Sequence, residues 1–138
     1  MLSLFSVVDL FREHVWGITV KGEIIKKIPY SQIRTMKYNA DNLRPTVEVI
    51  QSKFATCLDY ALAVERLCGG KLYRVKNRSH IYTLVDNMFT DFGGTYVNVY
   101  PKEELLNMDI DLVEITIRNP IHRNNIFTKE EWLCFSIL

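Results

Sequence analysis

The order of apolar and polar positions along the 138-residue chain predicts one central helix. Nine of the twelve side chains in residues 57–68 are apolar, Thr56 precedes them as a suitable N-cap, and Gly69-Gly70 follow as a helix end. Such a helix exposes little polar surface, so it should be covered on most sides. We therefore expect a buried helix from Cys57 to Cys68, with Asp59 in its first turn.

After the two glycines the apolar positions alternate with polar ones, which is typical of strands. Turn residues separate four such runs, which together predict an antiparallel meander packed on the central helix. The runs are KLYRV, SHIYTLV, NMFTDF and GTYVNVY. A further strand is expected in DLVEITI, and short helices are expected in PKEELLN and FTKEEW.

The beginning of the chain predicts one helix and two strands. Apolar side chains recur at helical spacing in residues 3–15, and Gly17 is expected to end that helix. The run ITVKGEIIKKIP predicts two short strands around Lys21-Gly22. The polar stretch from Tyr30 to Arg44 has few periodic signals, and no element is assigned to it.

The segment before the central helix predicts a short helix followed by a loop. Pro45 suits the start of a helix that runs through Val49 or Ile50, and Gln51 to Thr56 is polar enough for a loop. No linker, repeat or low-complexity segment interrupts the chain. Residues 1–138 are therefore expected to form a single compact domain of the α+β class.

Composition and charge narrow the choice of partners. About half of the residues are apolar (48%) and the net charge is +1 with scattered Lys and Arg residues, so we expect a real core and neither nucleic acid nor an anionic membrane as partner. The apolar opening carries Asp9, Arg12 and Glu13 too early for a secretion signal or a membrane span. Three cysteines match no zinc spacing and predict free thiols in a cytoplasmic protein without metal or cofactor.

The run SHIYTLVDNMFTDFGG contains the candidate acid–base pair. If Asp86-Asn87 is the two-residue turn of a hairpin, Tyr82 lies opposite Asp91, and His80 shares a face with Tyr82. His80 and Asp91 are then diagonal neighbours with β-carbons about 7 Å apart, within reach of one another. Asp86, at the hairpin tip, is expected to point to solvent.

Cys57, at the start of the central helix, completes a possible catalytic triad. A helix N-terminus and a neighbouring imidazolium both stabilise a thiolate, and a carboxylate fixes the tautomer of the ring. Taken singly, each residue also has a structural interpretation: Cys57 as a small core residue, His80 as a sheet residue and Asp91 as a turn acid. Their order and their elements together favour catalysis. Cys68, Cys134, His14 and His122 are expected to be structural.

These residues resemble the papain-like cysteine peptidase superfamily and its transglutaminase-like relatives. The resemblance rests on a Cys at the amino end of a central helix, followed by His and Asp on antiparallel strands, over roughly residues 51–100. It implies a papain-like core and a role for Gln51, six positions before Cys57, as an oxyanion-hole donor. The Gly-rich and Trp-containing sequence of the papain family proper is missing around Cys57, so its substrate groove is not carried over.

The run HIYTLVDNMFTDFGG also resembles the His-to-Asp segment of arylamine N-acetyltransferases, which implies acyl transfer by the same three residue types. The first hypothesis is a cysteine hydrolase, a peptidase or amidase that acts on a protein or peptide through an acyl-enzyme, with Cys57, His80, Asp91 and Gln51 as its site. One alternative is an acyltransferase or transglutaminase with the same triad. The other is a non-enzymatic binding or inhibitory module, for example of phage origin, on an inactive papain-like scaffold.

Overall fold

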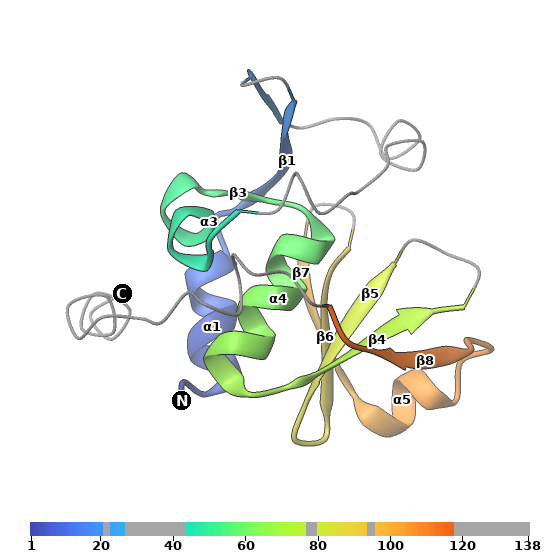
Figure 1. Cartoon of the computed structure of the whole chain (residues 1–138). Coiled ribbons are helices and arrows are strands. Elements are labelled where there is room, and N and C mark those ends of the chain that lie inside the picture. The colour runs from blue at the N-terminus through green and yellow to red at the C-terminus, as the bar shows by residue number, and fades with distance from the viewer. Residues whose placement is uncertain (21–22, 27–43, 77–79, 94–95, 118–138) are drawn as a thin grey trace.

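The fold is mixed α+β, as the sequence predicts, with one helix at its centre. A computed structural model of the chain describes residues 1–20, 23–26, 44–76, 80–93 and 96–117 (Figure 1). Helix α4 (Cys57–Cys68) packs on a five-stranded antiparallel sheet with the strand order β7-β6-β5-β4-β8. The strands are β4 (Lys71–Val75), β5 (Ile81–Val85), β6 (Met88–Gly93), β7 (Tyr96–Pro101) and β8 (Leu112–Ile115).

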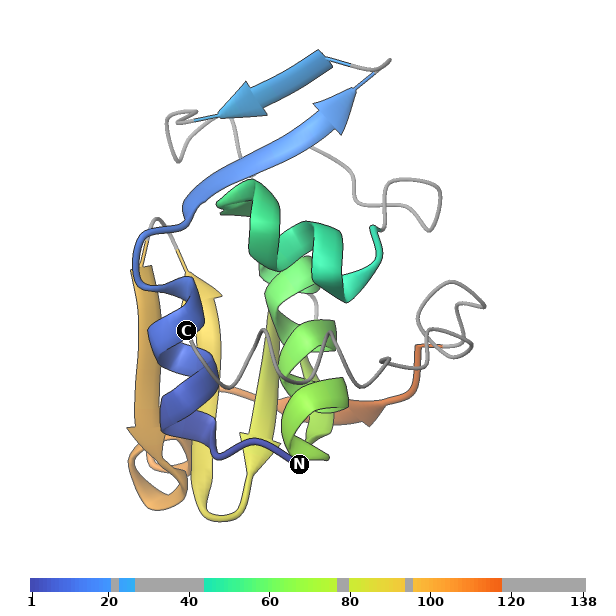
Figure 2. The same cartoon turned by 90° about the vertical axis from the view of Figure 1, so that its left-hand side faces the viewer.

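The two faces of this sheet are covered by different helices. Helices α1 (Leu4–Phe11) and α4 lie side by side over one face (Figure 2). There the Tyr60 ring packs near Phe92, and the Thr83 hydroxyl donates to a carbonyl of α4. On the other face Leu105 of α5 (Lys102–Leu106) packs in one apolar cluster with Tyr82 and Phe89. The alternation of side chains along β5 and β6 thus builds two cores.

Local sequence signals fix both ends of α4, and the predicted bounds are confirmed. The Thr56 hydroxyl accepts from the Asp59 amide, and the Asp59 carboxylate accepts from the Thr56 amide, which is a complete capping box. At the other end Gly69 is left-handed, with φ of 74°. A residue with a side chain is strained there, so glycine ends the helix.

The predicted meander is also confirmed, including its hairpin. Strands β5 and β6 pair with Val85 opposite Met88 and Leu84 opposite Phe89. Asp86 begins the two-residue turn with φ of 53°, a left-handed conformation that Asp tolerates better than most residues. The hairpin alignment therefore follows from the residues at its tip.

A second, smaller sheet near the N-terminus corrects the prediction of a helix over residues 3–15. Helix α1 ends at Phe11, and β1 (Val15–Val20) pairs with β2 (Glu23–Lys26) and, in parallel, with β3 (Phe54–Ala55). Val15 lies beside Phe54 in this ladder, so tertiary pairing outweighs the helical spacing of the apolar residues. Gly17 lies inside the strand, whereas the two strands predicted around Lys21-Gly22 are confirmed.

The predicted loop from Gln51 to Thr56 is wrong in part. Helix α3 (Thr46–Ser52) begins after Pro45 as expected but runs through Gln51 and Ser52, and Lys53 ends it with φ of 62°. Phe54 and Ala55 then form β3. The helix predicted in FTKEEW and nearly all of the polar stretch from Tyr30 to Arg44 lie outside the described residues. In the described ranges, no helix combines the length and apolarity needed to cross a membrane.

Shortening Leu67 should destabilise the fold without disturbing the start of α4. Leu67 is fully buried in the largest apolar cluster, close to the C-terminal end of the helix. Leu67→Ala should lower the free energy of unfolding in urea by about 2–5 kcal/mol, because the cavity left behind collapses only in part. The matched control Leu106→Ala, at an exposed position, should change it by less than about 1 kcal/mol. Equal effects of both variants would contradict this view of the core.

Candidate active site

The candidate nucleophile sits at the junction of the α4 start and the sheet. Cys57 is the first residue of α4, is buried, and packs in a small apolar cluster with Leu62, Leu72 and Ile81. Its thiol is free rather than in a disulfide. The capping box determines which residue begins the helix, so it also determines that the thiol lies at the helix N-terminus.

The structure brings His80 and Asp91 together, as the hairpin alignment predicts. His80 directly precedes β5, and its Nε2 lies 2.5 Å from Oδ2 of Asp91 on β6. The ring of Tyr82 packs edge-on against the imidazole, with 4.8 Å between centroids. Because Asp91 occupies Nε2, Nδ1 is the ring nitrogen left for the thiol. The His80 side chain is 28% exposed and that of Asp91 only 4%, so solvent reaches the ring but hardly reaches the carboxylate.

His80 has a strongly shifted pKa with identifiable causes. Burial alone would lower it, but the hydrogen bond with Asp91 and then the contact with Cys57 outweigh burial and raise the pKa of His80 to about 9. The thiol therefore lies within interaction distance of the imidazole. At neutral pH the ring is an imidazolium between a thiol and a carboxylate, the charge state that favours a thiolate nucleophile.

The start of α4 also offers backbone amides next to Cys57. The capping box engages the amides of Thr56 and Asp59, and the Tyr60 amide donates to the Thr56 carbonyl. The amides of Cys57 and Leu58 lie between them in the first turn, where helix geometry supplies no acceptor from a preceding turn. They are available as donors to a negatively charged oxygen.

Gln51, the fourth residue proposed from the sequence, is placed differently from the other three. It lies in the last turn of α3, and its side chain is exposed. Among these four described residues, no hydrogen bond joins Gln51 to Cys57, His80 or Asp91. The structure thus brings three of the predicted residues together and leaves Gln51 on a neighbouring helix.

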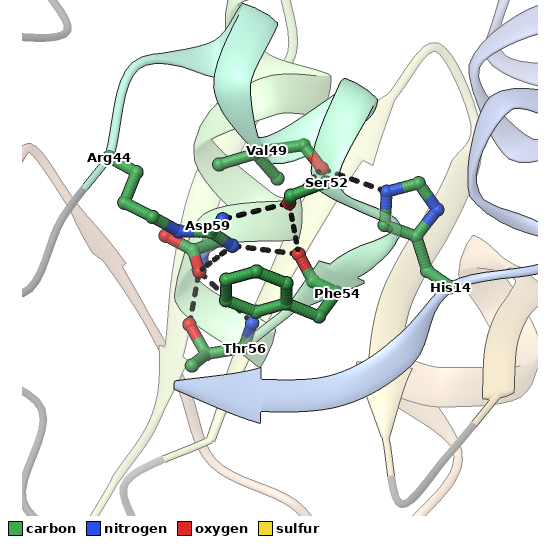
Figure 3. Close-up of polar contacts among 7 residues, drawn as sticks. All are labelled: His14, Arg44, Val49, Ser52, Phe54, Thr56 and Asp59. Atoms are coloured by element: carbon green, nitrogen blue, oxygen red, sulfur yellow. Dashed lines mark hydrogen bonds and ion pairs between the residues drawn. The ribbon is translucent and has the colours of Figure 1, made fainter. Parts of the chain in front are cut away.

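A buried arginine next to this site was missed by the sequence analysis. Arg44 donates from Nη1 to the Ser52 hydroxyl at 2.8 Å, and from Nη2 to the Phe54 carbonyl at 2.7 Å and to Oδ2 of Asp59 at 3.4 Å (Figure 3). Burial raises the pKa of Asp59, and the Arg44 charge opposes that shift. No local sequence pattern predicts this network. Arg44 is the last residue of a polar stretch, and its hydrogen-bond partners lie 8 to 15 residues later in the chain. A lone Arg between a polar stretch and Pro45 was the only available signal.

The other candidate residues have structural settings or lie outside the described residues. His14 is buried against Phe11 and bonds the Val49 carbonyl through Nε2 at 2.9 Å (Figure 3), and burial lowers its pKa. Asp86 is exposed at the hairpin tip, as expected. His122 and Cys134 lie in the part of the chain that is not described. Within the described part, no cluster of three or more His, Cys, Asp or Glu side chains could hold a metal ion.

Comparison of the chain with protein-family models, with curated proteins and with solved structures found no match. The function of the site is therefore inferred from its own residues and their geometry.

The protonation of His80 can be measured by NMR. Its imidazole should titrate near pH 9, and Asp91→Asn should lower its pKa, because the main raising interaction is lost while burial remains. Since the folded-state pKa lies above the unfolded value of about 6.5, this contribution to stability is complete below pH 6.5 and is lost as the pH rises through 9. His14, with its lowered pKa, is an internal control. An unchanged His80 titration in Asp91→Asn would contradict the assignment.

Proposed function

We propose that the protein is a cysteine-nucleophile hydrolase, a peptidase or amidase that acts on a protein or peptide substrate through a Cys57–His80–Asp91 triad. The observation that carries the proposal is the bond between His80 Nε2 and Asp91 at 2.5 Å, together with the interaction of Cys57 with the same imidazole, which helps to raise its pKa. A structural histidine needs one hydrogen-bond partner, whereas a thiol and a carboxylate on the same ring form the arrangement used in nucleophilic catalysis. A papain-like core is part of this proposal.

In the first half of the reaction, Cys57 attacks the substrate carbonyl as a thiolate. His80, whose pKa of about 9 keeps it protonated at neutral pH, supplies the positive charge that stabilises this thiolate. The negative charge moves to the carbonyl oxygen, where the Cys57 amide at the helix start and the Gln51 side chain donate hydrogen bonds. Gln51 is exposed and hydrogen-bonds none of the triad residues, so its side chain would turn to the substrate on binding.

In the second half, the tetrahedral intermediate collapses. His80 gives its proton to the leaving amine, the carbon–nitrogen bond breaks, and an acyl-thioester on Cys57 remains. The ring, now neutral, takes a proton from water as water attacks the thioester. The carbon–sulfur bond then breaks, the acid product leaves, and the thiolate–imidazolium pair is regenerated. An amine in place of water would make the same site an acyltransferase. Asp91 holds the ring in the required tautomer throughout.

A thiol probe separates an activated cysteine from a packed one. At pH 7 iodoacetamide should label Cys57 at least about tenfold faster than Cys68, because Cys57 lies beside a protonated imidazole. Burial and the nearby Asp86 raise the pKa of Cys68 to about 11, which keeps it a thiol. Peptide mass spectrometry resolves the two sites, and His80→Ala should remove the difference. Slow and equal labelling of both cysteines would favour a non-enzymatic binding module.

Cleavage of a peptide library tests the reaction itself. Wild-type protein should release new amino termini, Cys57→Ala should not, and Gln51→Ala should reduce the rate by about a hundredfold to a thousandfold if its amide is an oxyanion donor. Because Gln51 is exposed, that variant should unfold within about 0.5 kcal/mol of wild type. Adding a primary amine and scoring acyl-amine products distinguishes transfer from hydrolysis. Cleavage that persists in Cys57→Ala would refute the proposed nucleophile.

A further inference from the structure

The ion pair between Arg44 and Asp59 has no step in the proposed reaction, yet it lies at the start of the helix that carries the nucleophile. Both side chains are deeply buried, at 9% and 3% exposure. Apolar residues in place of a buried ion pair are often equally or more stabilising, so such a pair is weak evidence for stability alone. Its position beside Cys57 suggests a different use.

The electrostatic setting of Cys57 depends on both members of this pair. Cys57 and Asp59 share the first turn of α4, and a carboxylate there completes the capping box. An unpaired buried carboxylate in the same helical turn would disfavour a negative charge on the Cys57 sulfur. The Arg44 guanidinium, 3.4 Å from Oδ2 of Asp59, supplies the compensating charge.

Arg44 also fixes the first turn mechanically. Its two terminal nitrogens bond the last residue of α3, Ser52, and the carbonyl of Phe54 in β3, while the guanidinium lies 3.7 Å over the centroid of the Phe54 ring (Figure 3). One planar group therefore connects the end of α3, the strand β3 and the start of α4. Gln51 is the neighbour of Ser52, so the same contacts hold its helix in place.

We propose that Arg44 is a positioning residue for the Cys57 nucleophile: it neutralises the Asp59 carboxylate in the first turn of α4 and holds that turn against the end of α3. This inference rests on the proposed function, because it assigns Arg44 a role in the reactivity of Cys57. Its guanidinium acts through Asp59 and does not touch the reacting atoms.

Four charged groups on four segments set the reactivity of Cys57 in this account. His80 precedes β5 and Asp91 lies on β6, where together they supply the imidazolium–carboxylate pair. Asp59 belongs to α4 itself, and Arg44 precedes α3. Removing Arg44 and removing Asp59 should therefore change the rate of Cys57 alkylation in opposite directions, although each removal leaves a buried charge unpaired and destabilises the fold.

The test measures the rate of Cys57 alkylation by iodoacetamide from pH 5 to 10, by peptide mass spectrometry, below the unfolding temperature of each variant. Arg44→Met should slow labelling at pH 7 about tenfold, the effect of one nearby unit charge, with recovery at higher pH. Asp59→Asn, which keeps a capping oxygen, should speed labelling or move its onset to lower pH. Arg44→Met/Asp59→Asn should return to within about threefold of wild type, because both charges are gone.

Arg44→Lys and Arg12→Met are the controls. Lysine keeps the charge but loses the planar fork, so its labelling rate should lie closer to wild type than that of Arg44→Met, with a lower melting temperature than wild type. Arg12 pairs with Asp9 at 2.6 Å on the exposed surface of α1. Arg12→Met should therefore change neither the Cys57 labelling rate nor the melting temperature. The inference would be overturned if Arg44→Met and Asp59→Asn changed the rate of Cys57 labelling in the same direction, or if neither changed it. If Cys57 is no faster than Cys68 in wild type, the proposed function fails instead.

Discussion

The point at which α4 begins is the constraint on which the site depends. An α-helix turns by about 100° per residue, so a start displaced by one residue would change the direction of the Cys57 side chain by that angle. The reciprocal bonds of Thr56 and Asp59 prevent this displacement. Arg44 adds a tertiary anchor, because its partners lie on both sides of the helix start. Local capping and long-range packing thus both favour Cys57 as the first residue of the helix.

The site keeps several charges away from water, and each of them has a partner. His80 loses hydration on burial, but Asp91 and Cys57 compensate so fully that the protonated ring is favoured. Asp59 is more deeply buried, and the Arg44 charge and the Thr56 amide compensate part of the cost of removing its carboxylate from water. The carboxylates of Asp91 and Asp59 therefore have different roles, although both are buried and both pair with a cation. One stabilises a cation that can move a proton, and the other stabilises a helix end.

Elements with a local chemical signal could be predicted from the sequence. Both ends of α4 could be predicted from Thr56, Asp59 and Gly69. The hairpin that brings His80 to Asp91 could be predicted from the turn residues Asp86-Asn87. The failures have a different physical origin. Val15 continues the apolar spacing of α1, but it pairs with Phe54, which only the tertiary fold places beside it. The place of Arg44 next to the site could likewise not be predicted, because no nearby sequence pattern indicates that its partners are Ser52, Phe54 and Asp59.

The parallel pairing of β1 with β3 also bears on the order in which the molecule assembles. The β5–β6 hairpin is local, and hairpins form in about 1–10 μs. The contact of Val15 with Phe54, immediately before the α4 cap, must first close a long loop, which slows its formation. We expect the imidazole–carboxylate half of the centre to exist before the thiol is aligned with it. When the full-length chain refolds from denaturant, the sulfur would then be the last of the three groups to reach its place.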